Sequence, residues 1–183
     1  MVEVPPNPDW YDARFDPYLI QVGRIATMWG DLEFAVNQSI WELANVEPSV
    51  GACLTAQLVT IGSRMRALLA LLHFRDAEDE LLKEFSRLDN KIEGLGRQRN
   101  RWVHDPVALG RGGELRRIHV TADKRLDYAV KDADLVEMHE LHVKIREASL
   151  EFRALYKKAR DALPPWPRTQ FEQAPRSILS VPL

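Results

Sequence analysis

The sequence predicts an all-α fold, a bundle of four to five helices in up-down order with a small β-hairpin inserted before the last long helix. Apolar residues recur at steps of three and four over most of the chain, which is the spacing of one helix face. The spacing changes once, between residues 110 and 132, to short runs rich in β-branched and aromatic residues. Short links between the helical segments favour antiparallel neighbours.

The first helix is expected at residues 17–45, after a Pro-rich leader. The segment "VEPSV" interrupts the helical pattern, and residues 52–74 resume it as one helix or as a pair broken near "TIGS", where Gly62 and β-branched residues lower helix propensity. The apolar stripe of the first helix consists of Val22, Ile25, Trp29, Leu32, Val36, Ile40 and Leu43.

The third helix is expected to begin after Asp76, which can act as its N-cap with Asp79 three residues on. Its apolar stripe runs through Ile92 and Leu95, and one more step of four reaches Arg99. We therefore expect Arg99 on the packed side of the helix, where a cation needs a partner or a functional cleft. Pro106 disfavours helical geometry at the residue before it, so the helix should end near His104.

The segment with the changed period is expected to form a hairpin at about 113–130, in which "ELRRIHV" and "RLDYAV" are joined by "TADK". Asp134 and Glu137 then form a start like a capping box for the last helix, which runs to about Leu163. Prolines follow Leu163, so residues 164–183 are expected to be an extended tail, loose or draped over a neighbouring surface. The predicted organisation is a leader (1–16), a single helical domain (17–163) and this tail.

Composition narrows the class of protein. The chain has 183 residues, of which 45% are apolar, enough for one domain with a buried core. Its formal net charge of −2 argues against a protein whose whole surface binds nucleic acid. Cys53 is the sole cysteine, and the longest aliphatic run, "ALLALL", is too short to span a bilayer. We therefore expect a cytoplasmic protein without a membrane segment.

Positive charge is concentrated around "GLGRQRNRWVHDP", residues 94–106. Six arginines and only two acidic residues lie between Gly96 and His119. Histidine is a common general acid or base at neutral pH, so His104 is a candidate for that role, and a nearby guanidinium can bind a phosphate and stabilise the charge that develops on it. In the structural alternative, His104 only caps the last carbonyls of its helix and Arg99 pairs with a carboxylate from another helix.

The segment "RNRWVH", Arg99 to His104, resembles the Arg-(four to six residues)-His signature of the HEPN superfamily, with Asn100 as the polar residue that often follows the arginine. The architecture resembles that of the family over about residues 17–163. Two other Arg-His pairs have similar spacing, one from Arg97 and one from Arg66 to His73, and the latter lies inside an apolar helical run. The position of Arg99 to His104 at the end of the third helix, in the most basic segment, favours it.

The resemblance implies an α-helical homodimer in which two copies of the motif face one cleft. It implies a metal-independent RNA endonuclease of the kind found in toxin-antitoxin and phage-defence systems. Arg99 would contact the scissile phosphate, His104 would move protons, and Asn100 would orient them. Arg97 and Arg101, with the hairpin residues Arg116 and Arg117, are the candidate RNA-binding residues.

The expected partners are a second copy of the chain, RNA, and an antitoxin or nucleotidyltransferase-like protein. Other members of the family lack catalysis, so a non-catalytic helical module that binds a nucleotide or a protein partner is the alternative. The charged hairpin arginines also fit a solvated strand edge that is protected from pairing.

No metal or cofactor is expected. His139 and His142, in "HELH", have a spacing that could hold a metal. No cysteine or further histidine cluster accompanies them, so a metal site is the weaker interpretation.

Overall fold

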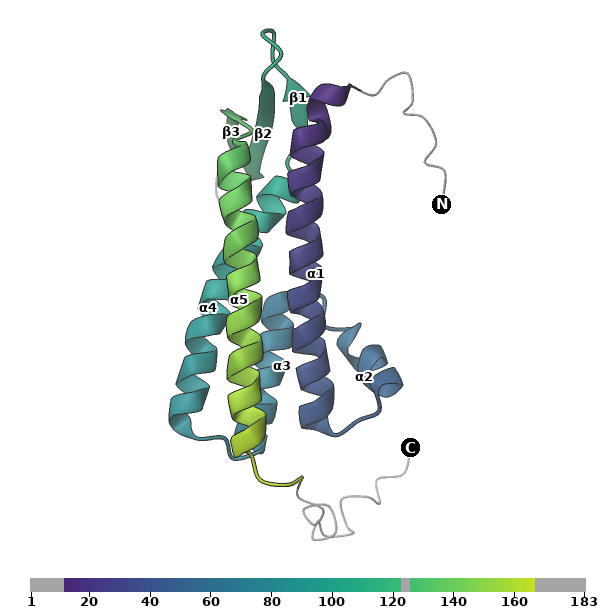
Figure 1. Cartoon of the computed structure of the whole chain (residues 1–183), viewed down its shortest axis with the longest axis vertical. Helices are drawn as coiled ribbons and strands as arrows, with labels where there is room; N and C mark the ends of the chain where they lie inside the picture. The colour runs from purple at the N-terminus through teal and green to yellow at the C-terminus, as the bar shows by residue number, and fades with distance from the viewer. Residues whose placement is uncertain (1–11, 123–125, 167–183) are drawn as a thin grey trace. The chain divides into compact units, whose positions relative to one another are not determined.

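The computed structural model of the chain describes residues 12–122 and 126–166 (Figure 1). This part is mostly helical and carries one small antiparallel sheet, which confirms the coarse fold prediction. The predicted leader and tail lie largely outside it. The elements in chain order are a 3₁₀ turn (Ala13–Phe15), α1 (Asp16–Ala44), α2 (Pro48–Thr55), α3 (Ile61–Phe74), α4 (Asp79–His104), β1 (Val107–Leu109), β2 (Leu115–Ala122), β3 (Leu126–Asp132) and α5 (Leu135–Ala162).

Packing divides the chain into two compact units, which we describe separately. Among the described residues, the first unit combines those of Met1–Ala35 with those of Leu88–Phe152, and the second combines Val36–Arg87 with those of Arg153–Leu183. Helices α1, α4 and α5 contribute residues to both units. The single domain expected at residues 17–163 stays a prediction.

The first unit has its core where α1, α4 and α5 turn their apolar stripes inward. Side-chain hydrogen bonds join these helices: the Tyr18 hydroxyl donates to the carbonyl oxygen of Trp102 at 2.7 Å, the Ser149 hydroxyl donates to Asp31 at 2.9 Å, and Lys91 donates to Glu151 at 2.7 Å. Most residues of the apolar stripes predicted for α1 and α4 are buried, so the periodicity of the sequence identified the core face of these two helices. The largest fully buried side chains of this unit are Ile25, Leu32, Leu88, Ile92, Met138, Leu141, Ile145 and Phe152.

The sheet has three strands in the order β1-β2-β3 and lies beside the starts of α1 and α5 (Figure 1). The predicted hairpin corresponds to β2 and β3, which pair antiparallel from Arg116 opposite Asp132 to Ala122 opposite Leu126. The prediction of a two-stranded hairpin was incomplete, because β1 adds a third strand through three residues opposite Leu115–Arg117. A segment as short as β1 shows no alternation in sequence and becomes a strand only by pairing with β2.

The second unit contains α2 and α3, so the apolar run after "VEPSV" is a pair of helices. The first of the pair begins at Pro48, within "VEPSV", because proline is well suited to the first turn of a helix. A capping box formed by Thr60 and Ser63 starts α3. The buried apolar residues of this unit are Val36, Ile40, Leu43, Ile61, Met65, Leu68, Leu72, Leu81, Leu82, Phe85, Leu155, Tyr156 and Ala159.

Asp76 does not cap α4, contrary to the prediction. It has a φ of 55° and follows the end of α3. Its amide donates to the carbonyl of His73, and the next amide, of Ala77, donates to that of Leu72. This is a Schellman ending, in which aspartate tolerates the left-handed conformation that glycine usually supplies. Helix α4 starts only at Asp79.

The predicted start of the last helix is confirmed. The Asp134 side chain accepts hydrogen bonds from the amides of Val136 at 2.7 Å and Glu137 at 3.2 Å, which makes it the N-cap of α5. The helix ends at Ala162, one residue before the predicted end. Within residues 12–122 and 126–166, no helix combines the length and apolar character needed to cross a bilayer.

Candidate functional site

The last two turns of α4 carry the predicted site in the first unit. Arg97, Asn100, Arg101 and His104 follow one another at spacings of three or four residues, or are adjacent, so they lie along one side of the helix. Arg97, Asn100 and His104 are exposed, and Arg101 is half-buried. Arg97 also lies 3.9 Å from the Glu93 carboxylate, one turn earlier. This helix end therefore presents cationic and polar groups together.

Arg99 leaves the helix on a different side, in line with the buried residues Ile92 and Leu95. The side chain is half-buried, and its Nε is enclosed without a hydrogen-bond partner among the described residues. Its Nη1 donates to Oδ1 of Asn100 at 2.9 Å. The amide of Asn100 therefore holds the Arg99 guanidinium at the border between the packed side and the exposed side.

His104 is the last residue of α4, and its exposed ring makes no hydrogen bond or ion pair with another described residue. His104 lies five positions after Arg99, which corresponds to about 140° around a helix. The imidazole and the Arg99 guanidinium therefore point to different sides of the same helix end. Around the helix, the side chain of Asn100 leaves in a direction closer to that of His104 than the side chain of Arg99 does.

A second group of polar side chains joins the end of α4 to β2, and we call it the His119 cluster: Arg101, Asp105, Arg117 and His119. Nδ1 of His119 lies 2.8 Å from Nη1 of Arg101 and 3.3 Å from the Asp105 carboxylate. Arg117 reaches the same carboxylate at 3.9 Å. The side chains of Asp105, Arg117 and His119 are only 12–14% exposed, so these charges interact with little screening by solvent.

The two contacts of His119 compete for one nitrogen. A neutral ring whose Nδ1 lacks a proton can accept from Arg101, whereas a ring protonated at Nδ1 can donate to Asp105. Either bond anchors β2 to the end of α4. Sequence reasoning missed His119 and Asp105. The sequence feature that could have revealed His119 is the alternation of residues along β2, which places Arg117 and His119 on one face of the strand.

Arg117 stacks on an aromatic ring that is part of the core. Its guanidinium carbon lies 4.0 Å from the centre of the Trp102 ring, a cation-π contact. The backbone carbonyl of Trp102 accepts the hydrogen bond from Tyr18. Burial raises the pKa of Tyr18, Arg117 opposes this rise, and Asp105 adds to it.

Arg116 lies on the opposite face of β2 from Arg117, because neighbouring residues of a strand alternate. It pairs with Glu114 at 3.1 Å and with Asp132 on β3 at 2.8 Å. A hydrogen bond from the backbone of Glu114 lowers the pKa of its carboxyl group, and the side-chain hydrogen bond from Arg116 lowers it further. Among the four predicted RNA-binding arginines, Arg101, Arg116 and Arg117 thus have close intrachain partners. The structure does not bring Arg116 to the side of the sheet that faces α4.

The histidine pair of α5 lies outside this site. The rings of His139 and His142 have centroids 5.9 Å apart. Desolvation, followed by the charges of His139, Arg24 and Arg146, lowers the pKa of His142. Among the described residues, no group of three or more His, Cys, Asp or Glu is arranged to hold a metal ion.

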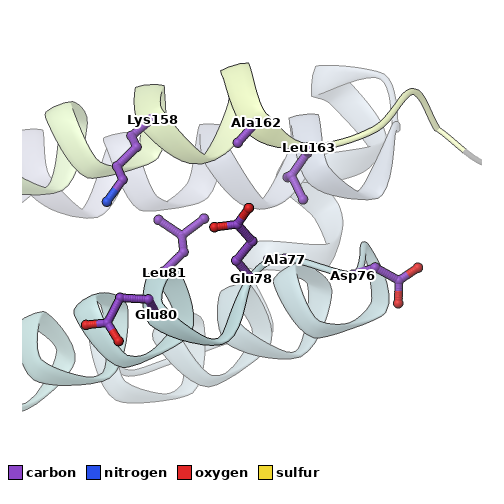
Figure 2. A pocket seen from close by; sticks show the side chains of 8 residues that line it. All are labelled: Asp76, Ala77, Glu78, Glu80, Leu81, Lys158, Ala162 and Leu163. Atoms are coloured by element: carbon purple, nitrogen blue, oxygen red, sulfur yellow. The ribbon is translucent and has the colours of Figure 1, made fainter.

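A pocket of about 170 Å³ lies in the second unit, between the segment before α4 and the end of α5. Figure 2 shows the Glu78 carboxylate turned toward Ala162 and Leu163, whereas the Asp76 side chain points away. Lys158, which also lines it, bonds to Glu84 at 2.7 Å. None of the predicted site residues lines this pocket.

Comparison of the chain with protein-family models, curated proteins and solved structures finds no match. The resemblance to the HEPN superfamily therefore depends on the residues from Arg99 to His104 and on the helical character of the chain.

Proposed function

We propose that this protein is a metal-independent RNA endonuclease of the HEPN type that acts as a homodimer. The observation that carries the proposal is the 2.9 Å bond from Arg99 to Asn100 in the same last turns of α4 that end at the exposed His104. The end of α4 thus supplies a guanidinium held by an amide, and an exposed imidazole that solvent or a substrate can reach. These are the groups that the proposed chemistry requires.

In the proposed reaction, the 2′-hydroxyl of a ribose attacks the adjacent phosphorus and loses its proton to a neutral imidazole of His104. The new bond joins the 2′-oxygen to phosphorus, and the bond from phosphorus to the 5′-oxygen of the next nucleotide breaks. A protonated imidazole donates a proton to that leaving oxygen. Arg99 binds the phosphate and stabilises the negative charge that develops on it. The products are a 2′,3′-cyclic phosphate and a 5′-hydroxyl.

The divergence of Arg99 and His104 on one helix favours a site made by two chains. A single His104 cannot be acid and base at the same moment, whereas two rings in one cleft can divide these roles. A two-fold contact repeats each group on the opposite side of the cleft. Arg99 of one copy and His104 of the other can then approach the same phosphate.

The first test is cleavage of total RNA by the purified protein in EDTA. His104→Ala and Arg99→Ala should each lower the cleavage rate by about 10²- to 10⁴-fold, the usual contribution of a proton-transfer group or a charge-stabilising group. Asn100→Ala should lower the cleavage rate less than these two substitutions, because the Arg99 guanidinium remains and loses only the hydrogen bond that positions it. Mass spectrometry should find cyclic phosphate ends.

Matched controls come from the second Arg-His pair of the chain. Arg66 and His73 are both exposed on α3, and replacing either with Ala should leave cleavage unchanged. Cleavage that survives both His104→Ala and Arg99→Ala would remove the site. Activity lost in EDTA and restored by a divalent ion would replace the proposal with a metal-dependent nuclease.

The composite site is tested by mixing subunits. Wild-type and His104→Ala chains are refolded together at varied ratios, so that dimers form at random. If both His104 rings of a dimer are needed, activity should fall as the square of the wild-type fraction. A linear fall would mean that each chain carries a complete site.

A non-catalytic helical module is the second candidate, and one observation favours it. Three of the candidate RNA-binding arginines already have partners within the chain: His119 for Arg101, Asp132 for Arg116 and the Trp102 ring for Arg117. These contacts leave less positive charge for an RNA strand. Such a module would bind a mononucleotide or a protein partner without cleaving RNA. Retained binding of a fluorescent nucleotide, together with absent cleavage, would favour it. Growth arrest on expression in a host cell, relieved by His104→Ala, would instead support a toxin or phage-defence effector.

A further inference from the structure

Strand β3 is an edge of the sheet, because among the described strands it pairs with β2 alone. One face of the sheet carries Ile118, which is half-buried, and three exposed apolar side chains, Val120, Tyr128 and Val130. Val120 is 48% exposed, Tyr128 62% and Val130 50%, and Tyr128 lies directly opposite Val120 in the register. An edge strand beside an exposed apolar face is a template for pairing with another strand.

Proteins commonly protect such an edge with charge. In β3 the charges are arranged so that they oppose pairing with an arbitrary strand but favour pairing with a copy of β3. Asp127 and Lys131 lie two residues before and two residues after Ala129. A two-fold antiparallel pairing centred on Ala129 places Asp127 of each copy opposite Lys131 of the other. The same register places Tyr128 opposite Val130, on the exposed apolar face.

The neighbouring registers do not give this match. Centring the pairing on Tyr128 or on Val130 places Asp127 opposite an alanine, either Ala129 or Ala133. Opposite charges across strands stabilise pairing, and like charges destabilise it. Charge therefore selects one register.

The environment of Lys131 within its own chain supports the same conclusion. Its partner across the sheet is Arg117, so two cations lie opposite each other on neighbouring strands. Arg117 turns to Trp102 and Asp105, and Lys131 is left exposed. An aspartate supplied from the other side of β3 would neutralise Lys131.

We propose that two copies of this chain associate through their β3 edges, antiparallel and centred on Ala129, to form one continuous six-stranded sheet. The partner is a second copy because the sequence of β3 is complementary to itself in charge and in apolar character. A single pair of strands buries less surface than a standard interface, so we expect association in the micromolar range. This interface does not depend on RNA cleavage, although the proposed nuclease also requires a dimer.

The test is sedimentation equilibrium of the full chain from one to hundreds of micromolar. Wild type should be a monomer-dimer mixture. Lys131→Glu should weaken dimerisation roughly 10- to 100-fold, because two attractive pairs become repulsive. Combining Asp127→Lys with Lys131→Glu should restore the wild-type dissociation constant. Lys144→Glu, a change of the same charge on α5, should leave it unchanged.

Each result has a definite meaning. Lys131→Glu places a glutamate directly across the sheet from Arg117, and this attraction favours the pairing of β2 with β3. The variant should therefore retain its sheet, which circular dichroism can verify. A wild-type protein that stays monomeric throughout the range would overturn the interface. So would a dimer that is insensitive to Lys131→Glu, or one that the charge exchange fails to restore.

A cysteine cross-link tests the register directly. In the proposed pairing the two Ala129 Cα atoms are about 4.5 or 5.5 Å apart, within disulfide range, whereas the two Tyr128 Cα atoms are more than about 7 Å apart. With the exposed Cys53 replaced by Ser, Ala129→Cys should give a covalent dimer under mild oxidation, and Tyr128→Cys should not. Dimers that form without cross-linking at position 129 would place the interface elsewhere. The response to Lys131→Glu and the cross-link at position 129 report on this interface alone, whereas RNA cleavage reports on the nuclease. A dimer that neither change affects would therefore overturn the interface and leave the proposed nuclease standing.

Discussion

Tyr18→Phe removes one oxygen atom and tests how the end of α4 is held. The Tyr18 hydroxyl, on α1, donates at 2.7 Å to the carbonyl of Trp102. Trp102 lies in the last turn of α4, where carbonyl groups have no partner within the helix. Tyr18 is 7% exposed and Trp102 5%, so little water can replace the lost hydroxyl.

The expected loss follows from these facts. A buried hydrogen bond contributes about 1 kcal/mol net, and leaving its acceptor unsatisfied costs about 1–3 kcal/mol. The phenyl ring of the variant keeps the apolar contacts, so no cavity adds to the loss. We therefore expect the free energy of unfolding to fall by about 1–2 kcal/mol, and the melting temperature to fall by roughly 2–8 °C for a chain of this size.

The measurement is urea unfolding followed by far-ultraviolet circular dichroism, with Tyr128→Phe as the control. Tyr128 is 62% exposed, so removal of its hydroxyl should change stability by less than about 0.5 kcal/mol. Equal effects of the two substitutions would refute the reasoning. A Tyr18→Phe variant as stable as wild type would show that solvent satisfies the Trp102 carbonyl.

Three further predictions concern other parts of the molecule. Asp134→Ala should lower the free energy of unfolding by about 1 kcal/mol, measured by urea titration, because α5 loses its N-cap, and Asp134→Asn should recover most of this loss. Gly51→Ala should destabilise by roughly 1–3 kcal/mol in thermal unfolding although alanine favours helices, because its Cβ would overlap the Trp41 ring; a stabilised variant would contradict the packing. Burial raises the pKa of Tyr18, and burial followed by the Glu42 hydrogen bond raises that of Tyr156. The stability that these tyrosines contribute is complete below the pKa of an unfolded tyrosine, about 10, and is lost as pH rises through their folded pKa values; alkaline unfolding curves should therefore show a smaller loss for Tyr156→Phe, and an unchanged slope would contradict the assignment.

Several features could be predicted from the sequence because they depend on residues within about four positions of one another. Pro106 ends α4 at His104 through a steric clash with the residue before it. Asp134 starts α5 by accepting amides two and three residues later. The spacing of apolar residues identified the buried faces of the helices, since a helix repeats every 3.6 residues. The same rule placed Arg99 beside Leu95, on the side where the structure has it.

Asp76 shows where such local rules stop. Aspartate can cap the start of a helix or occupy the left-handed position after one, and the local sequence around Asp76 fits both. The structure selects the second, because the end of α3 is closed by the amides of Asp76 and Ala77. The packing of Trp41 over Gly51 was equally absent from any local signal.

The surroundings of the candidate site show the same division between local and tertiary information. The sequence by itself determined that a basic helix end carries Arg99 and His104. Only the tertiary structure decided that Arg101 meets His119 and that Arg117 turns to Trp102. Those contacts depend on the register of β2 and on its distance from α4, which are set by hydrogen bonds and packing between segments 14 to 18 residues apart. At such separations along the chain, the sequence alone does not show which partner a charged side chain will have in the folded protein.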